Sequence, residues 1–107
     1  MPTYNKLVRD NIPQILHKQN LNFRHKILQE KEFQKYLRLK LDEEISELDQ
    51  ATNSKDKLEE LADILEILFT MTSSLKYKKS DLMKTRDKKL TKKGGFQKKY
   101  FLIDVEN

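Results

Sequence analysis

Five carboxylates near the middle of this 107-residue sequence have the residue types and the spacing that metal-assisted chemistry requires. They form two groups separated by twelve residues, with Glu43, Glu44 and Glu47 in the first group and Glu60 and Asp63 in the second. Mg²⁺ prefers hard oxygen ligands, and waters and substrate phosphates usually complete its shell. A bound Mg²⁺ also acidifies a water that can attack phosphorus. The two groups therefore predict a site for a metal and a phosphorylated substrate.

A long amphipathic helix is predicted to carry the first group. Between residues 30 and 51 the apolar side chains recur every three or four positions and define one helical face: Phe33, Leu37, Leu41, Ile45 and Leu48. Because a helix advances about 100° per residue, Glu44 points into this face, whereas Glu43 and Glu47 lie at its border. An ionised carboxylate in apolar surroundings must meet a cation or take up a proton. For Glu44 alone, an ion pair with a neighbouring Lys or Arg would suffice to explain a carboxylate in the apolar face.

Another helix, over residues 55–75, is predicted to carry the other group and to be the most buried helix. Glu60 and Asp63 lie one turn apart at the edge of its apolar arc, where a solvated surface would by itself explain them. If the two helices pack antiparallel, however, Glu44 and Glu47 face this pair across the interface. Four converging carboxylates repel one another, and facing helices of a bundle are a known setting for carboxylate metal sites. A divalent metal at the interface is therefore the favoured interpretation.

The two acidic groups and their flanking leucines resemble a known signature. EEISE at residues 43–47 and ELAD at residues 60–63 resemble the EExxE–ExxD motif of the all-α nucleoside triphosphate pyrophosphohydrolases, the MazG-like superfamily. Two further segments resemble its phosphoribosyl-ATP pyrophosphohydrolase-like branch, namely YNKLVRDNIP at residues 4–13 and KKGGF at residues 92–96. The resemblance extends over nearly the whole chain, from residue 4 to about residue 102.

This resemblance implies a reaction and a set of residue roles. The reaction is hydrolysis of a nucleoside triphosphate or related nucleotide to the monophosphate and pyrophosphate, with Mg²⁺ as cofactor and Mn²⁺ as its substitute. Glu44, Glu47, Glu60 and Asp63 would bind one or two metal ions, and Glu43 would orient a ligand or a water. A carboxylate that is not fully committed to metal would accept the proton of the attacking water. The resemblance also implies a helical bundle that forms a homodimer or a homotetramer.

Basic residues flank the acidic centre and are expected to hold the substrate phosphates. The net charge is +4 over residues 1–28, −6 over residues 29–75 and +7 over residues 76–107. Such segregation suits a site that holds a metal on acids and a polyanion on bases, and pairing between subunits is the simpler alternative. The candidate phosphate-binding residues are Lys6, Arg9, Arg86, Lys89 and Lys93. Arg9 has a competing interpretation as one half of an ion pair, and Lys93 stands where proteins of this branch often have Arg.

The remaining pattern predicts a mainly all-α fold. Pro13 marks the first turn of a short first helix, and Ser80 is expected to cap a fourth helix that ends at the Gly pair of residues 94–95. Apolar residues predict short peripheral strands at residues 21–28 and 100–105, which would pair with each other. The expected architecture is an antiparallel bundle of about four helices. Because 36% of the residues are charged, the core must be thin, and oligomerisation is expected to complete it.

Length and composition narrow the classes of protein. Residues 1–107 are enough for a single domain, and the absence of cysteine excludes disulfides and thiolate metal sites. No apolar stretch is long enough to span a bilayer and the N-terminus has no apolar signal region, so a cytosolic protein without a membrane partner is expected. The alternative functions are a nucleic-acid binder that uses the basic residues 76–99 and a helical adaptor. Nucleic acid is not the expected partner, because it leaves Glu44 facing Glu60 and Asp63 unexplained.

Overall fold

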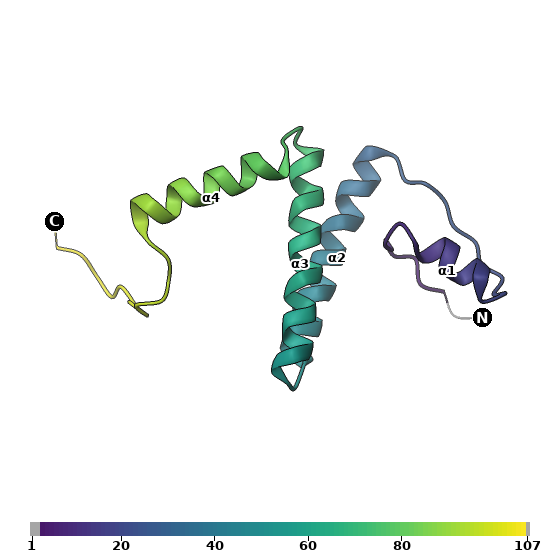
Figure 1. Ribbon diagram of the computed structural model, residues 1–107, viewed down its shortest axis with the longest axis horizontal. Coiled ribbons are helices and arrows are strands. Elements are labelled where there is room, and N and C mark those ends of the chain that lie inside the picture. The colour runs from purple at the N-terminus through teal and green to yellow at the C-terminus, as the bar shows by residue number, and fades with distance from the viewer. Residues whose placement is uncertain (1–2, 107) are drawn as a thin grey trace.

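The computed structural model describes residues 3–106, which form four helices joined by turns and extended segments (Figure 1). The helices are α1 (Ile12–Lys18), α2 (Glu30–Gln50), α3 (Ser54–Ser74) and α4 (Lys79–Lys93). The predicted all-α class is confirmed. None of the helices formed by these residues combines the length and the apolar composition that crossing a lipid bilayer would require.

α2 and α3 form an antiparallel pair at the centre of the molecule (Figure 1). The apolar face of each helix packs against the other, and Leu37 of α2 and Ile67 of α3 are only 3% and 7% exposed. The Asn53 side chain caps α3 by accepting a hydrogen bond from the backbone N–H of Asp56 at 2.9 Å. This cap stands where the sequence predicts the break between the two helices. The pair therefore brings the acidic residues of both helices to one interface.

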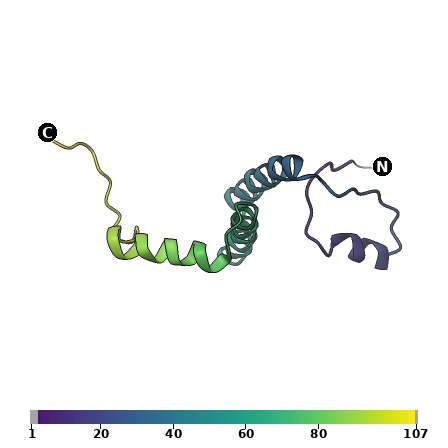
Figure 2. The same cartoon turned by 90° about the horizontal axis from the view of Figure 1, so that it is seen from above.

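The two ends of the chain leave the α2–α3 pair in opposite directions (Figures 1 and 2). α1 lies on the side of α2, whereas α4 extends from the end of α3 and packs against that helix alone among the described helices. The backbone N–H of Lys78 donates to the Asp81 carboxylate at 2.8 Å, so the cap of α4 is Lys78, two residues before the predicted cap at Ser80. α4 ends at Lys93 and is followed by the C-cap Gly94, whose φ of +82° is a conformation that glycine adopts readily.

The two predicted strands do not form within residues 3–106. Residues 21–28 and 100–105 are mostly extended, but neither belongs to a ladder. A strand needs a partner for its backbone hydrogen bonds, and α4 carries the C-terminal segment to the far end of the molecule from the N-terminal one (Figure 1). The expected pairing of these two segments is therefore wrong.

One chain by itself does not close into a four-helix bundle. Its radius of gyration is 18.4 Å, whereas about 13 Å is typical of a compact chain of this length. Its accessible surface is 10424 Å², whereas about 6,300 Å² is expected for a compact monomer of 12.8 kDa. An apolar face of the α2–α3 pair accounts for part of the excess, with side chains 39–67% exposed: Ile45, Leu58, Leu61, Leu65 and Leu68. The chain thus presents a large apolar surface that its own helices leave open.

Candidate metal centre

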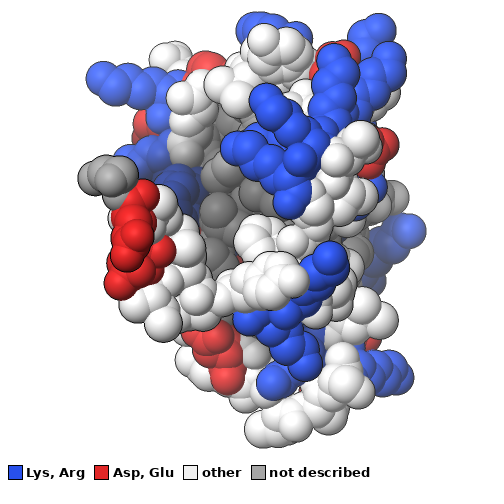
Figure 3. All heavy atoms as spheres, turned by 90° about the vertical axis from the view of Figure 1, so that its left-hand side faces the viewer, with Lys and Arg blue, Asp and Glu red and all other residues white. Residues whose placement is uncertain are grey.

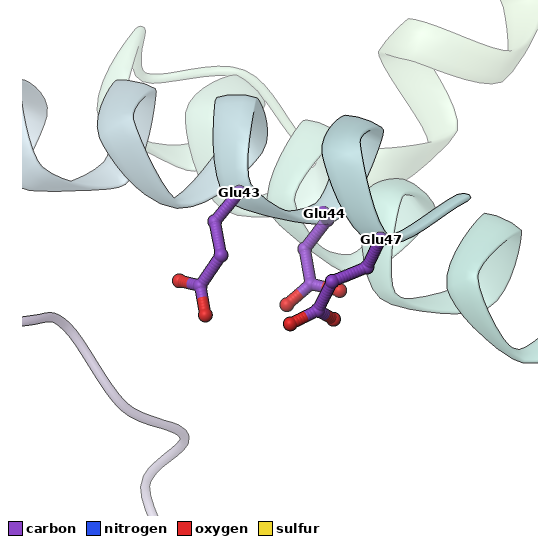
Figure 4. A group of neighbouring side chains, drawn as sticks. All are labelled: Glu43, Glu44 and Glu47. Atoms are coloured by element: carbon purple, nitrogen blue, oxygen red, sulfur yellow. The ribbon is translucent and has the colours of Figure 1, made fainter. Parts of the chain in front are cut away.

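The five predicted carboxylates meet on one side of the α2–α3 pair. Glu43, Glu44 and Glu47 project from adjacent turns of α2 in a common direction (Figure 4). Glu60 and Asp63, one turn apart on α3, lie close to Glu44. In the sets Glu43–Glu44–Glu47 and Glu44–Glu60–Asp63, one carboxylate oxygen from each residue lies within 4.8 Å of the others. Glu44 belongs to both sets and therefore links the two helices.

Glu44 is a buried carboxylate that is short of hydrogen-bond donors. The residue is 6% exposed, and the Oε2 atoms of Glu44 and Glu60 are buried without a hydrogen-bond partner among the described residues. Burial raises the pKa of Glu44, and the adjacent Glu60 and Asp63 raise it further. Leaving a buried acceptor unpaired costs stability, so such atoms are rare in folded proteins. These two oxygens on facing helices are therefore acceptors that a cation would satisfy.

Lys40 of α2 was not among the residues expected from the sequence, yet it contacts the cluster. Its Nζ atom lies 3.2 Å from the Glu43 carboxylate and 3.6 Å from that of Glu44, and its side chain is mostly buried. Residues three and four positions apart on a helix are neighbours, so this spacing could have revealed Lys40. Burial and Glu60 raise the pKa of Glu44 by more than Lys40 lowers it. A single lysine therefore does not neutralise the buried carboxylates.

The other two glutamates that α2 contributes to the cluster, Glu43 and Glu47, differ in their affinity for protons. Burial tends to raise the pKa of Glu43, but hydrogen bonds from Lys6 and Lys40 outweigh this effect and lower it. Desolvation and repulsion by Glu44 raise the pKa of Glu47, although this side chain is open to solvent. Glu44 and Glu47 are therefore better proton acceptors than Glu43.

The N-terminal segment brings two of the predicted bases to the carboxylates. Lys6 donates a hydrogen bond to Glu43 at 3.1 Å, and Arg9 forms an ion pair with Asp63. The hydrogen bond with Glu43 raises the pKa of Lys6. Of the two interpretations of Arg9, a phosphate ligand or one half of an ion pair, the structure shows the ion pair. These two contacts tie the segment to both helices of the site.

The other three predicted bases do not reach the carboxylates of their own chain. Arg86, Lys89 and Lys93 belong to α4, which turns away from the α2–α3 pair after Leu75 (Figure 1). Arg86 pairs with the adjacent Asp87 at 2.9 Å. Figure 3, which views the molecule from the side toward which α4 extends, shows Lys and Arg side chains spread over this end with fewer acids between them.

The space beside the carboxylates is small. A hollow of about 70 Å³ lies between the N-terminal segment and α2, and its lining includes Lys6, Tyr36, Leu39, Lys40 and Glu43. Binding pockets for small organic ligands usually measure about 300–1,000 Å³. This hollow, which borders Glu43 alone among the five carboxylates, has room for a few waters but not for a whole nucleotide.

The candidate ligand atoms suit a hard divalent cation. Every candidate ligand is a carboxylate oxygen, the type that Mg²⁺ and Mn²⁺ prefer. The buried Oε2 atoms of Glu44 and Glu60 supply two acceptors that no donor among the described residues occupies.

Comparison with protein-family models, with curated proteins and with solved structures finds no match to this chain.

Proposed function

We propose that this protein is a Mg²⁺-dependent pyrophosphohydrolase that converts a nucleoside triphosphate or a related nucleotide to the monophosphate and pyrophosphate. The observation that carries the proposal is the pair of buried, unpartnered oxygens of Glu44 and Glu60 within a cluster of five carboxylates. A cluster that served only to pair charges would provide a donor for each buried oxygen. The resemblance of the two acidic motifs to those of MazG-like enzymes supports the choice of reaction.

The residues of the cluster take different parts in this reaction. Glu44, Glu60 and Asp63 would hold a metal ion, and Glu47 adds a further oxygen beside Glu44. When bound, Mg²⁺ supplies neutralisation of phosphate charge and acidification of a water. In the proposed reaction a water would attack the α-phosphorus, the bond from this phosphorus to the bridging oxygen would break, and pyrophosphate would leave. A carboxylate of the cluster that is not bound to the metal would accept the water proton.

We further propose that the protein forms a homodimer or a homotetramer. The chain exposes about 4,000 Å² more surface than a compact monomer of its mass. Obligate dimers bury about 1,000–2,500 Å² on each subunit, so the excess suffices for one such interface and leaves room for a second. The apolar face of the α2–α3 pair, centred on Leu61 and Leu65, is the surface best suited to this contact.

The test is product analysis with a panel of substrates. Purified protein is incubated with nucleoside triphosphates, deoxynucleoside triphosphates and phosphoribosyl-ATP, in Mg²⁺ and in EDTA, and the products are separated by chromatography. We expect monophosphate and pyrophosphate in Mg²⁺ only. Glu44→Gln should lower the rate at least 100-fold, because it removes the carboxylate shared by both sets of ligands.

A matched control is available on α3. Glu59 precedes Glu60 but is exposed and belongs to neither carboxylate set, so Glu59→Gln changes the charge equally and should retain activity. Release of diphosphate and orthophosphate would contradict the proposed cleavage site. Equal loss of activity in the two variants would contradict the proposed metal centre.

A further inference from the structure

The C-terminal arm, residues 76–106, has a surface that its own chain does not cover. Beyond α4 the arm carries a run of large apolar side chains that are 71–96% exposed: Phe96, Tyr100, Phe101, Leu102, Ile103 and Val105. So many exposed apolar groups in one segment indicate a surface that meets a partner. The arm extends away from the α2–α3 pair and contacts it only where α4 joins α3 (Figures 1 and 2).

The charge of the arm is complementary to that of the α2–α3 pair. Residues 76–107 have a net charge of +7, and residues 29–75, which include both helices, have a net charge of −6. Within one chain the turn after α3 holds these opposite charges apart (Figure 1). A second copy of the same chain supplies both the acidic surface that the arm matches and the apolar face that needs to be covered.

One face of α4 is suited to such a contact. Arg86, Lys89 and Lys93 recur at helical spacing, and Met83 and Leu90 lie on the same face. Both apolar side chains are substantially exposed. This face can therefore rest on apolar side chains while its cations reach toward carboxylates or phosphates.

The carboxylate site of one chain lacks cations that are free to bind phosphate. Lys6 and Lys40 pair with Glu43, and Arg9 pairs with Asp63. Among the described residues, no other Lys or Arg forms an ion pair with the five carboxylates. A triphosphate adds more negative charge than one Mg²⁺ neutralises, so further cations are needed to bind it. The hollow beside Glu43 is also too small to enclose a nucleotide.

The geometry points to an exchanged arm: the C-terminal arm of one copy lies across the carboxylate site of a second copy, where Arg86, Lys89 and Lys93 bind the substrate phosphates. This assignment rests on the proposed function for its substrate, a polyphosphate. The arrangement of the two copies does not depend on the substrate. The apolar tail of the arm would cover apolar surface of the second copy and close its site against water.

Cross-linking tests the arrangement without reference to catalysis, because the chain has no native cysteine. A tagged chain with Lys89→Cys is mixed with an untagged chain with Glu59→Cys, dissociated and reassembled, and treated with a short bismaleimide. The control replaces Glu59→Cys by Asp49→Cys, which helical periodicity places on the side of α2 away from Glu47. We expect a mixed cross-linked dimer with Glu59→Cys and at least tenfold less with Asp49→Cys. Equal yields, or a monomer by light scattering, would overturn the assignment.

Complementation between inactive chains tests the role of the cations. One chain carries Glu44→Gln, and the other carries Arg86→Gln, Lys89→Gln and Lys93→Gln. In an equal mixture half of the dimers are mixed and each has one intact site, so activity should recover to about a quarter of the wild-type value. The matched control for the second chain has the same loss of charge on the opposite face of α4, with Lys84→Gln, Lys88→Gln and Lys92→Gln, and should be active alone.

The outcomes separate the two proposals. An active wild type with no recovery in the mixture shows that the arm does not act in trans, and the exchanged arm is then rejected while the pyrophosphohydrolase stands. An inactive wild type that still cross-links through Lys89→Cys and Glu59→Cys rejects the substrate assignment and retains the exchanged arm.

Discussion

The Glu44 side chain lowers the stability of the folded protein because a buried charge is surrounded by other carboxylates. Burial and the adjacent Glu60 raise its pKa, and Lys40 only partly offsets them. Stability is commonly sacrificed in this way at functional sites, where charges are held in positions that the fold alone would not favour. The same features make Glu44 a strong ligand for a cation that enters the site.

Replacing this carboxylate should therefore stabilise the metal-free protein. The pKa of Glu44 is higher in the folded state than its ordinary value of 4.5, so the folded state binds more protons than the unfolded state. The contribution of Glu44 to stability then falls as the pH rises from 4.5 through the folded pKa of this residue. Glu44→Gln should raise the melting temperature in EDTA near neutral pH and flatten its dependence on pH. Thermal unfolding at a series of pH values, with Glu59→Gln as the control, measures both effects.

An unchanged pH slope in Glu44→Gln would show that the charge of this residue is already compensated. Addition of Mg²⁺ provides a second measurement on the same samples. We expect Mg²⁺ to raise the melting temperature of the wild type, because a ligand that binds only the folded state stabilises it. The corresponding shift should be reduced in Glu44→Gln and retained in Glu59→Gln.

At the scale of elements, the cap between α2 and α3 fixes how the two halves of the site meet. The Asn53 side chain accepts from the Asp56 N–H, which is one of the otherwise unpaired donors at the start of α3. Asn53→Ala should cost about 1 kcal/mol of unfolding free energy, because it removes this acceptor and the hydrogen bond that the Asn53 amide donates to the Asp56 carboxylate. Urea unfolding of the variant and the wild type at one protein concentration measures the difference. Equal stability of Asn53→Ala and the wild type would mean that the turn is held by helix packing alone.

α2 and α3 were predictable because their signals are local. Apolar residues at helical spacing and the Asn53 cap depend only on neighbours in sequence, and the predicted bounds differ from the observed ones by a single residue or less at each end. The facing of Glu44 toward Glu60 followed from the same periodicity. Lys40 lies four residues before Glu44 on α2, so the same helical spacing also places it beside the carboxylates.

The strands and the position of α4 were not predictable because they depend on partners. Residues 21–28 and 100–105 have apolar side chains suited to a strand, yet a strand is decided by the backbone that lies beside it. The start of α4 was misplaced because the Asp81 carboxylate accepts from the Lys78 N–H, a contact that Ser80 as the cap does not provide. The composition of α4 does not indicate the direction in which this helix leaves α3.

At the scale of the whole molecule, the apolar face of the α2–α3 pair should govern assembly. Leu65→Glu places a charge in the centre of this face and is expected to shift the protein toward the monomer, because burying an unpaired charge is costly. Ile27→Glu is the matched control, since Ile27 is highly exposed in the segment before α2. Light scattering over a range of concentrations measures the mass. A monomeric wild type, or an unchanged mass in Leu65→Glu, would contradict assembly through this face.

The small core of the single chain has a consequence for how its abundance translates into activity. Leu37 and Ile67 are the only buried apolar residues among those described, so the chain gains little apolar burial from folding alone, and the proposed dimer would supply more. When most chains are unassembled, mass action makes the amount of a dimer grow with the square of the amount of chain. Doubling synthesis would then quadruple the active species, and an unassembled excess would be exposed to proteolysis. Expression level would thus act as a threshold for activity without any dedicated regulator.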